Sequence, residues 1–115
     1  MARNLFTPCQ VGILELAHRV VLAPMSRYRC SKEMAPNSLV REYYEQRSTH
    51  GGLLITEATH INPEGTPIWK IYSAIREGGG DAPGIWTNKQ TTAYQKVVKS
   101  VHSKGSYISY ILIPV

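Results

Sequence analysis

Short apolar runs alternate along the chain with longer segments in which apolar residues recur at helical spacing. Residues 19–23 and 53–58 are apolar runs rich in β-branched side chains, and each predicts a buried strand. Residues 106–115 predict a third strand, which Pro114 stops. The looser alternation over residues 11–16 predicts a short strand or hairpin ahead of the main fold.

Two amphipathic helices are expected between these strands. The first covers residues 37–49, with its apolar positions at helical spacing and Gly51-Gly52 at its end. The second begins at Thr87, where "TNKQ" fits a capping box. Its apolar stripe suits packing against a sheet, and Lys104 and Gly105 suit its end. The stripe consists of Tyr94, Val97, Val98 and Val101.

Residues 59–86 are polar and rich in proline and glycine, and we expect a loop there. The triple glycine at 78–80 could form a phosphate cradle, but no strand immediately precedes it and no Lys-Ser/Thr pair follows it. A flexible loop is the favoured interpretation of this stretch.

The order strand, helix, strand, helix, strand predicts an α/β fold with a parallel sheet covered by helices. The length of 115 residues suits one small domain. In such folds ligands sit at the carboxyl ends of the strands, where Pro24 to Arg27 and Thr56 to Thr59 meet at one edge. Pro24 offers a carbonyl, Ser26 a hydroxyl, and Ala58 room for a flat ring. This edge could receive a planar heteroaromatic ligand.

The net charge of +5 and the pI of about 9.4 raise the question of an anionic partner. The basic residues are spread from Arg3 to Lys104, which favours a solvated surface, then a small anionic ligand, and only then nucleic acid. We expect no membrane partner and a cytoplasmic protein, because the sequence shows neither a long apolar span nor a secretory signal. Cys9 and Cys30 are expected to be reduced thiols.

Isolated polar residues carry weaker signals. The four histidines show no metal-ligand spacing, so no metal site is predicted. Glu57 could act as a general base, although a single carboxylate at a strand end is more often a structural hydrogen-bond partner. Arg27 could contact a ligand or lie in solvent.

Four blocks together resemble the N-terminal part of the old yellow enzyme family, with a particular likeness to plant 12-oxophytodienoate reductases. The blocks are residues 5–29 ("LFTP…HRVVLAPMSRYR"), 43–59 ("YYEQRSTHGGLLITEAT"), 83–90 ("PGIWTNKQ") and 97–105 ("VVKSVHSKG"). The resemblance implies the N-terminal portion of a TIM (β/α)8 barrel, incomplete, with about three parallel strands and two helices. It also implies FMN as cofactor and NADPH as reductant.

By this resemblance Pro24, Met25 and Ser26 form a flavin-contacting segment after the first barrel strand. The Ser26 hydroxyl would hydrogen-bond near the flavin carbonyl, and Ala58 would lie against the flavin. The implied substrates are enones of the oxylipin type, as in jasmonate-type lipid and fatty acid metabolism. The resemblance assigns no catalytic residue within this chain, because the family's catalytic side chains lie beyond residue 115.

The chain departs from the family in two places. Residues 59–82 are expected to be a long loop or insertion, in which residues 63–80 could be retained noncoding sequence or a duplication. Residues 106–115 form a divergent C-terminal tail in which Ile111 stands at the position of a flavin-binding glutamine.

Three hypotheses follow for the partial barrel domain over residues 1–115. The first is an ene-reductase that uses FMN and NADPH. The second is a truncated, inactive remnant that could associate with full-length relatives. The third, a small flavodoxin-like binding domain, is disfavoured by three strands and the lack of a phosphate loop.

Overall fold

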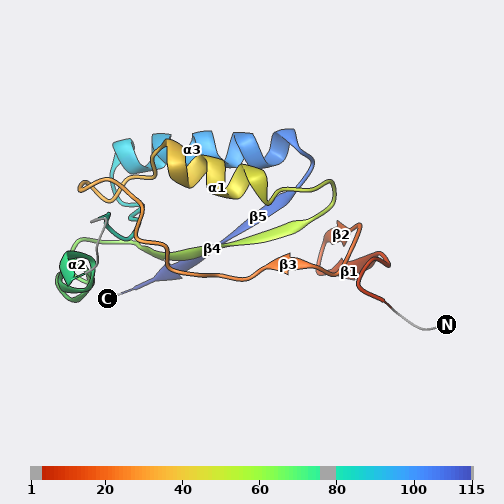
Figure 1. Cartoon of the computed structure of the whole chain (residues 1–115), viewed down its shortest axis with the longest axis horizontal. Coiled ribbons are helices and arrows are strands. Elements are labelled where there is room, and N and C mark those ends of the chain that lie inside the picture. The colour runs from red at the N-terminus through yellow and green to blue at the C-terminus, as the bar shows by residue number, and fades with distance from the viewer. Residues whose placement is uncertain (1–3, 76–79, 115) are drawn as a thin grey trace.

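A three-stranded parallel sheet with helices on one face forms the centre of the molecule (Figure 1). The computed structural model describes residues 4–75 and 80–114. The strands follow the order β3-β4-β5, and α1 and α3 cover the same face of the sheet. The bounds are β3 Val21–Leu22, β4 Leu53–His60, β5 Tyr107–Ile113, α1 Ser38–Gln46 and α3 Asn88–Ser103. The predicted parallel α/β arrangement is confirmed.

Helix α3 begins as its sequence predicts. The Thr87 hydroxyl accepts a hydrogen bond from the Gln90 backbone N–H at 3.2 Å, and the Gln90 side chain accepts one from the Thr87 N–H at 3.0 Å. This capping box satisfies N–H groups that have no partner within the helix. Gly105, with φ of +75°, follows the helix and leads into β5.

Helix α1 is shorter than predicted. Asn37 caps its start, since the side-chain oxygen accepts hydrogen bonds from the Leu39 and Val40 N–H groups at 3.0 and 3.1 Å. The helix ends at Gln46 instead of residue 49. Gly51 does not end the helix but forms the turn into β4, with φ of +67° and a side-chain position blocked by Ala17.

The core lies between the helices and the covered face of the sheet. Tyr94 packs edge-to-face on Tyr110 of β5, and its hydroxyl lies 2.9 Å from the Thr59 hydroxyl. The predicted stripe on α3 is therefore a sheet-packing face. The buried cluster comprises Cys30, Val40, Tyr44, Leu54, Tyr94, Val97 and Val101.

The expectation of a buried strand over residues 19–23 is wrong in extent and in burial. Only Val21 and Leu22 form β3, and Val21 is 38% exposed. Among the described residues β3 pairs with β4 alone, and no described element covers the face of the sheet opposite α1 and α3 (Figure 1). Strand β4 has a neighbour on each side and is the buried strand that its sequence predicts.

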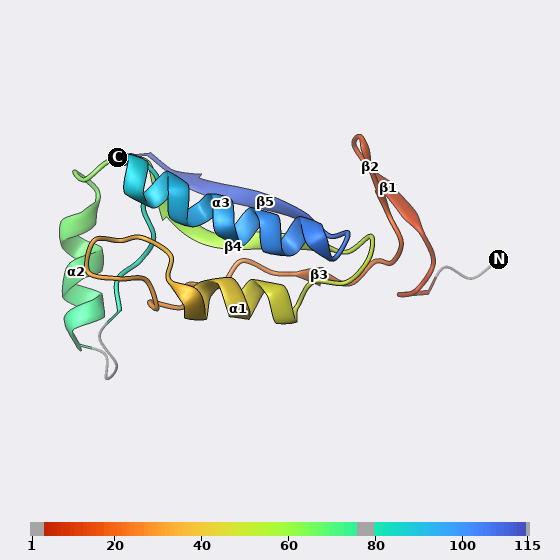
Figure 2. The ribbon, with the colours of Figure 1, turned by 90° about the horizontal axis from the view of Figure 1, so that it is seen from above.

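The expectation of a loop throughout residues 59–86 is also wrong. Helix α2 spans Thr66–Ile75, with Pro67 in its first turn, where a missing N–H costs nothing. It lies beyond the ends of the strands, apart from α1 and α3 (Figure 2), and Ile71 and Ile75 are exposed. Gly78 and Gly79 of the triple glycine lie outside the described residues.

The predicted N-terminal hairpin is confirmed. Strands β1 (Cys9–Val11) and β2 (Leu14–Leu16) pair antiparallel, and Gly12 turns between them with φ of +59°. The hairpin lies at the opposite end of the molecule from α2 (Figure 2). Cys9 and Cys30 are free thiols.

Candidate functional site at the carboxyl edge of the sheet

The predicted site residues lie at the carboxyl ends of β3 and β4. Val21 pairs with Leu53 and Leu22 with Leu54, so the segment after β3 runs on beside β4 (Figure 1). Pro24, Met25 and Ser26 in this segment are exposed. The structure thus presents a hydroxyl, a thioether and a proline ring at an accessible edge.

An irregularity in β4 divides the next residues between the two faces of the sheet. The register with β5 shifts between Ile55 and Ala58. Glu57 lines a cavity with helix residues, and Thr59 contacts Tyr94 on α3. Ala58 lies between them in sequence and therefore points to the opposite, open face, where it is half-buried.

Strand β5 places Ile111 beside Ala58. The two residues are partners in the parallel ladder, and Tyr110 before Ile111 packs toward the helices. Ile111 is 38% exposed on the open face. The position that the family resemblance assigns to a flavin-binding glutamine thus adjoins the small residue assigned to the flavin.

A buried carboxylate fixes the loop that carries Ser26. Glu57 is 2% exposed, and its Oε2 accepts a hydrogen bond from the Arg27 backbone N–H at 2.8 Å. Burial raises the pKa of Glu57, while hydrogen bonds from the backbone of Arg27 and Tyr28 and the Arg27 charge oppose that rise. Of the two roles weighed for Glu57, the structure shows the structural hydrogen bond.

The Arg27 side chain lies over an aromatic ring. Its guanidinium carbon is 5.3 Å from the centre of the Tyr43 ring, and the Arg47 guanidinium lies at 3.9 Å from the same centre. A cavity of about 210 Å³ opens here between the loop and α1. It is lined by Arg27, Arg29, Leu39, Val40, Tyr43 and Glu57.

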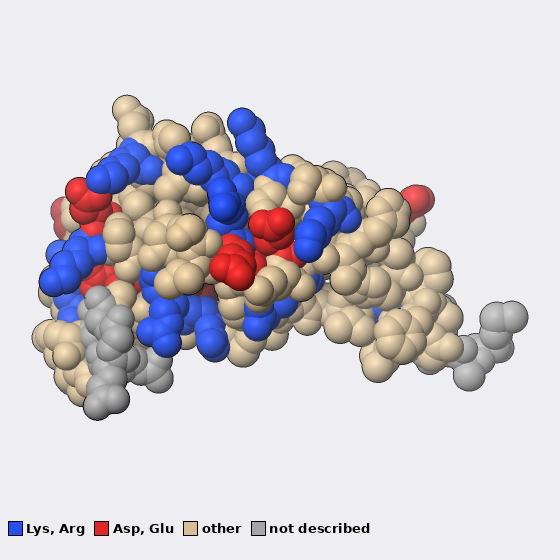
Figure 3. Space-filling view, turned by 45° about the horizontal axis from the view of Figure 1, so that its top comes forward, with Lys and Arg blue, Asp and Glu red and all other residues tan. Residues whose placement is uncertain are grey.

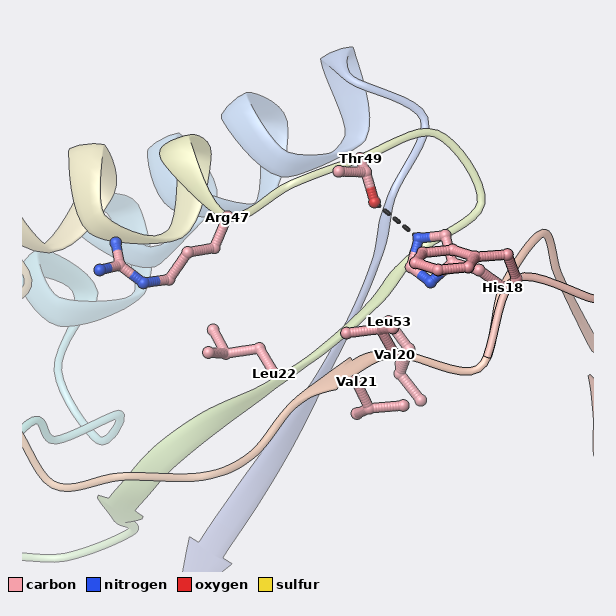
Figure 4. A pocket seen from close by; sticks show the side chains of 9 residues that line it. His18, Val20, Val21, Leu22, Arg47, Thr49 and Leu53 are labelled. Carbon is pink, nitrogen blue, oxygen red and sulfur yellow. Dashed lines mark hydrogen bonds between the residues drawn. The ribbon is translucent and has the colours of Figure 1, made fainter. Parts of the chain in front are cut away.

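A larger cavity of about 430 Å³ lies at the amino ends of the strands (Figure 4). Val20, Val21, Leu22 and Leu53 form apolar walls, and the His18 Nε2 lies 2.8 Å from the Thr49 hydroxyl. This cavity is at the end of the sheet remote from Ser26 and Ala58, so it does not contribute to the candidate site.

Basic and acidic side chains are mixed on one face of the molecule. On the face seen in Figure 3, lysine and arginine side chains are spread over the surface with acidic groups among them. No helix in the described part of the chain is long and apolar enough to cross a membrane.

The carboxyl edge fits one side of a flavin ring. A flat aromatic ring needs an open apolar surface with a small residue at closest approach and a polar group at its margin. Ala58 and Ile111 supply the surface, and Ser26 supplies the hydroxyl. The sequence predicts Pro24, Met25, Ser26 and Ala58 as site residues and favours a structural hydrogen bond for Glu57, but it does not identify the Ser26 loop as the partner of Glu57. The signal for this partner was limited to an acidic residue near the end of a buried strand.

Comparisons with known proteins agree on one family. The sequence model described as "NADH:flavin oxidoreductase / NADH oxidase family" matches residues 4–114. Chanoclavine-I aldehyde reductase of Penicillium roqueforti is 47% identical over 106 residues, which are 91% of this chain and 26% of that protein. A protein of rice, Oryza sativa subsp. japonica, provisionally named 12-oxophytodienoate reductase 2, is 45% identical over 102 residues, covering 89% of this chain and 24% of its own length.

A solved structure shows the same arrangement. Old Yellow Enzyme from Pichia sp. AKU4542 superposes with a TM-score of 0.79 at 39% identity, covering 95% of this chain and 26% of that one. The chain therefore spans about a quarter of the length of the relatives that it matches, and its sheet and helices correspond to part of their TIM barrel. On this sequence and structural evidence, the chain belongs to the NADH:flavin oxidoreductase / NADH oxidase family, which includes the old yellow enzymes.

Proposed function

We propose that the carboxyl edge of β3 and β4 is one wall of the flavin site of an FMN-dependent ene-reductase that uses NADPH. The observation that carries the proposal is the placement of Ser26 and Ala58. The Arg27 N–H to Glu57 hydrogen bond holds the residue after Ser26 against the residue before Ala58. Two segments from separate strands are thereby joined at the edge where the family resemblance implies flavin contacts.

Each residue has a distinct part in this proposal. The Ser26 hydroxyl would donate a hydrogen bond to a flavin carbonyl, and Ala58 would let the ring approach the backbone of β4. Pro24 and Met25 would form the apolar margin beside the ring. Bound FMN would supply hydride chemistry, taking a hydride from NADPH and delivering it to a carbon–carbon double bond.

The proposed substrate class is an enone, in which a carbonyl activates the double bond. The names of the relatives point to two kinds of carbonyl compound, an aldehyde in the fungal reductase and an oxylipin in the rice protein. Both are small molecules that contain a carbonyl group. We further propose that the substrate is an oxylipin.

An inactive protein is the alternative, and Ile111 favours it. An isoleucine beside Ala58 can neither donate nor accept a hydrogen bond, so the flavin would lose a polar contact there. In that case the chain would hold flavin weakly or act only in association with a full-length relative.

A substitution that fills the proposed ring position tests the function directly. Ala58→Leu should weaken FMN binding by about tenfold or more, because the longer side chain would occupy the space of the ring. Ser109→Leu is the matched control. Ser109 is exposed and pairs with Ile55, nearer the amino ends of the same two strands. Titration of flavin fluorescence with each variant gives the affinities. Equal affinities for the two variants would contradict the proposal.

A further inference from the structure

The loop that carries Ser26 depends on contacts with distant parts of the chain. Residues 23–29 belong to no helix or strand, and Tyr28 has a φ of +52°, which is unfavourable for a residue with a side chain. Such a conformation persists only where surrounding groups hold it. The groups that hold this loop therefore decide where Ser26 lies.

Two neutral contacts hold the far end of the loop. The Asn37 side-chain amide donates to the Arg29 carbonyl at 2.6 Å. Cys30 and Asp81 exchange backbone hydrogen bonds of 3.1 and 3.2 Å. These contacts begin three residues after Ser26, so they do not by themselves fix the position of Ser26. Another group must do so.

Glu57 holds the near end of the loop. Its carboxyl group accepts a hydrogen bond from the Arg27 backbone N–H at 2.8 Å and another from the Tyr28 backbone N–H. The carboxyl group can accept these hydrogen bonds in either protonation state. Arg27 directly follows Ser26, so a shift of the carboxylate would move the hydroxyl.

Strand β4 and helix α1 fix Glu57 in turn. The Tyr44 hydroxyl accepts a hydrogen bond from the Glu57 backbone N–H at 3.0 Å. The register shift in β4 turns the Glu57 side chain to the helix face while Ala58 remains on the open face. One strand irregularity thus positions both the loop anchor and the small residue of the proposed site.

We propose that Glu57 is a positioning residue for flavin, acting through the backbone of Arg27 and Tyr28 to hold Ser26 at the sheet edge. This inference rests on the proposed function and adds to it a residue that does not touch the ligand. It predicts that Glu57 controls flavin affinity without controlling the fold as a whole.

The charges around Glu57 suit this role. Arg27 and Arg29 line the same cavity, while the buried Tyr44, Tyr94 and Cys30 nearby have pKa values raised by burial and stay neutral near pH 7. Asp81 acts on Cys30, and Tyr43, which also lines the cavity, has the Arg47 guanidinium 3.9 Å from its ring centre. Among these described groups, the arginines alone bear a positive charge.

Three variants of the full chain test the inference. Glu57→Ala leaves the Arg27 and Tyr28 N–H groups without their acceptor and should raise the Kd for FMN by about tenfold. Glu57→Gln keeps one acceptor oxygen in place and should recover most of the affinity. Ser106→Ala removes the hydrogen bond from the buried Ser106 hydroxyl to the Thr49 carbonyl, at the amino end of the sheet, and serves as the control, with lower stability but an unchanged Kd.

Hydrogen exchange of the Arg27 and Tyr28 amides supplies a readout that needs no flavin. Both amides should exchange faster in Glu57→Ala than in the wild type and in Ser106→Ala, whereas amides in α3 should be unchanged. Unchanged exchange at Arg27 and Tyr28 would overturn the positioning role, and so would equal loss of FMN affinity in Glu57→Ala and Ser106→Ala. The wild type could also bind no FMN while Glu57→Ala still shows faster exchange at Arg27 and Tyr28. That result would overturn the proposed function and the flavin role of Glu57, and it would leave only the contact between Glu57 and the loop.

Discussion

Ala58 and Ile111 are partners in the parallel ladder between β4 and β5, and their side chains share the face of the sheet that no described helix covers. Their neighbours Thr59 and Tyr110 point the other way and both contact Tyr94. The pair therefore forms a small apolar floor at the carboxyl edge, next to the loop that carries Ser26.

Ile111→Gln should strengthen flavin binding. The amide would stand beside Ala58 on the open face, where the family resemblance expects a flavin-binding glutamine. One added hydrogen bond should lower the Kd for FMN by about two- to tenfold. Leu112→Gln is the control, because Leu112 is also exposed but pairs with Thr59 and points to the other face. Isothermal titration calorimetry gives both values, and a weaker or unchanged Kd for Ile111→Gln would count against the site.

Ser26→Ala should weaken FMN binding and leave the fold unaffected. The hydroxyl is exposed, so its loss should change the free energy of unfolding by less than about 0.5 kcal/mol. Loss of one hydrogen bond to the flavin should raise the Kd by roughly two- to tenfold. Ser38→Ala, at an exposed position at the start of α1, provides the comparison. Fluorescence titration should separate the two variants, and a Ser26→Ala affinity equal to that of the wild type would remove the hydroxyl from the proposed site.

Leu54→Ala should destabilise the chain much more than Leu53→Ala. Leu54 is 1% exposed within the buried cluster, whereas Leu53 is half-buried and lies on the opposite face of the same strand. Deleting the Leu54 side chain should cost about 2–5 kcal/mol, since a cavity remains in the core. Urea unfolding followed by circular dichroism measures both variants. Equal losses would mean that the helices do not cover the face assigned to them.

The raised pKa of Glu57 predicts a pH dependence of stability. A carboxyl group with a pKa raised in the folded state contributes stability below its ordinary value of 4.5 and loses that contribution as pH rises through the folded-state pKa. The free energy of unfolding of the wild type, relative to Glu57→Gln, should therefore decrease across that range. Denaturant melts at a series of pH values measure this difference. A difference that stays constant or grows with pH would show that burial does not dominate at Glu57.

Local signals in the sequence predicted much of the fold. The capping box at Thr87 and the apolar stripe after it specify α3, because both the cap and the period act within a few residues. Strand β4 begins with the apolar run from Leu53 to Ile55, as expected of a strand with neighbours on both sides, and polar residues follow. The short strand or hairpin predicted over residues 11–16 is a hairpin in the structure.

Other features depend on contacts that local patterns do not reveal. The run ending at Leu22 looked buried, yet β3 is an edge strand with one open face. Helix α2 was missed because Pro67 and the flanking glycines suggested a loop, although proline suits a first helical turn. The role of Glu57 depends on an irregularity in β4 that turns the Glu57 side chain toward the helices. The sequence carries no sign of this irregularity.

The most direct test of the account is the visible absorption spectrum of the purified 115-residue chain after incubation with FMN and desalting. A chain that carries the proposed flavin wall should retain flavin absorbance, and Ala58→Leu should retain less than Ser109→Leu. A chain that is folded by circular dichroism but retains no flavin would contradict the proposal that the edge formed by Ser26 and Ala58 binds the cofactor.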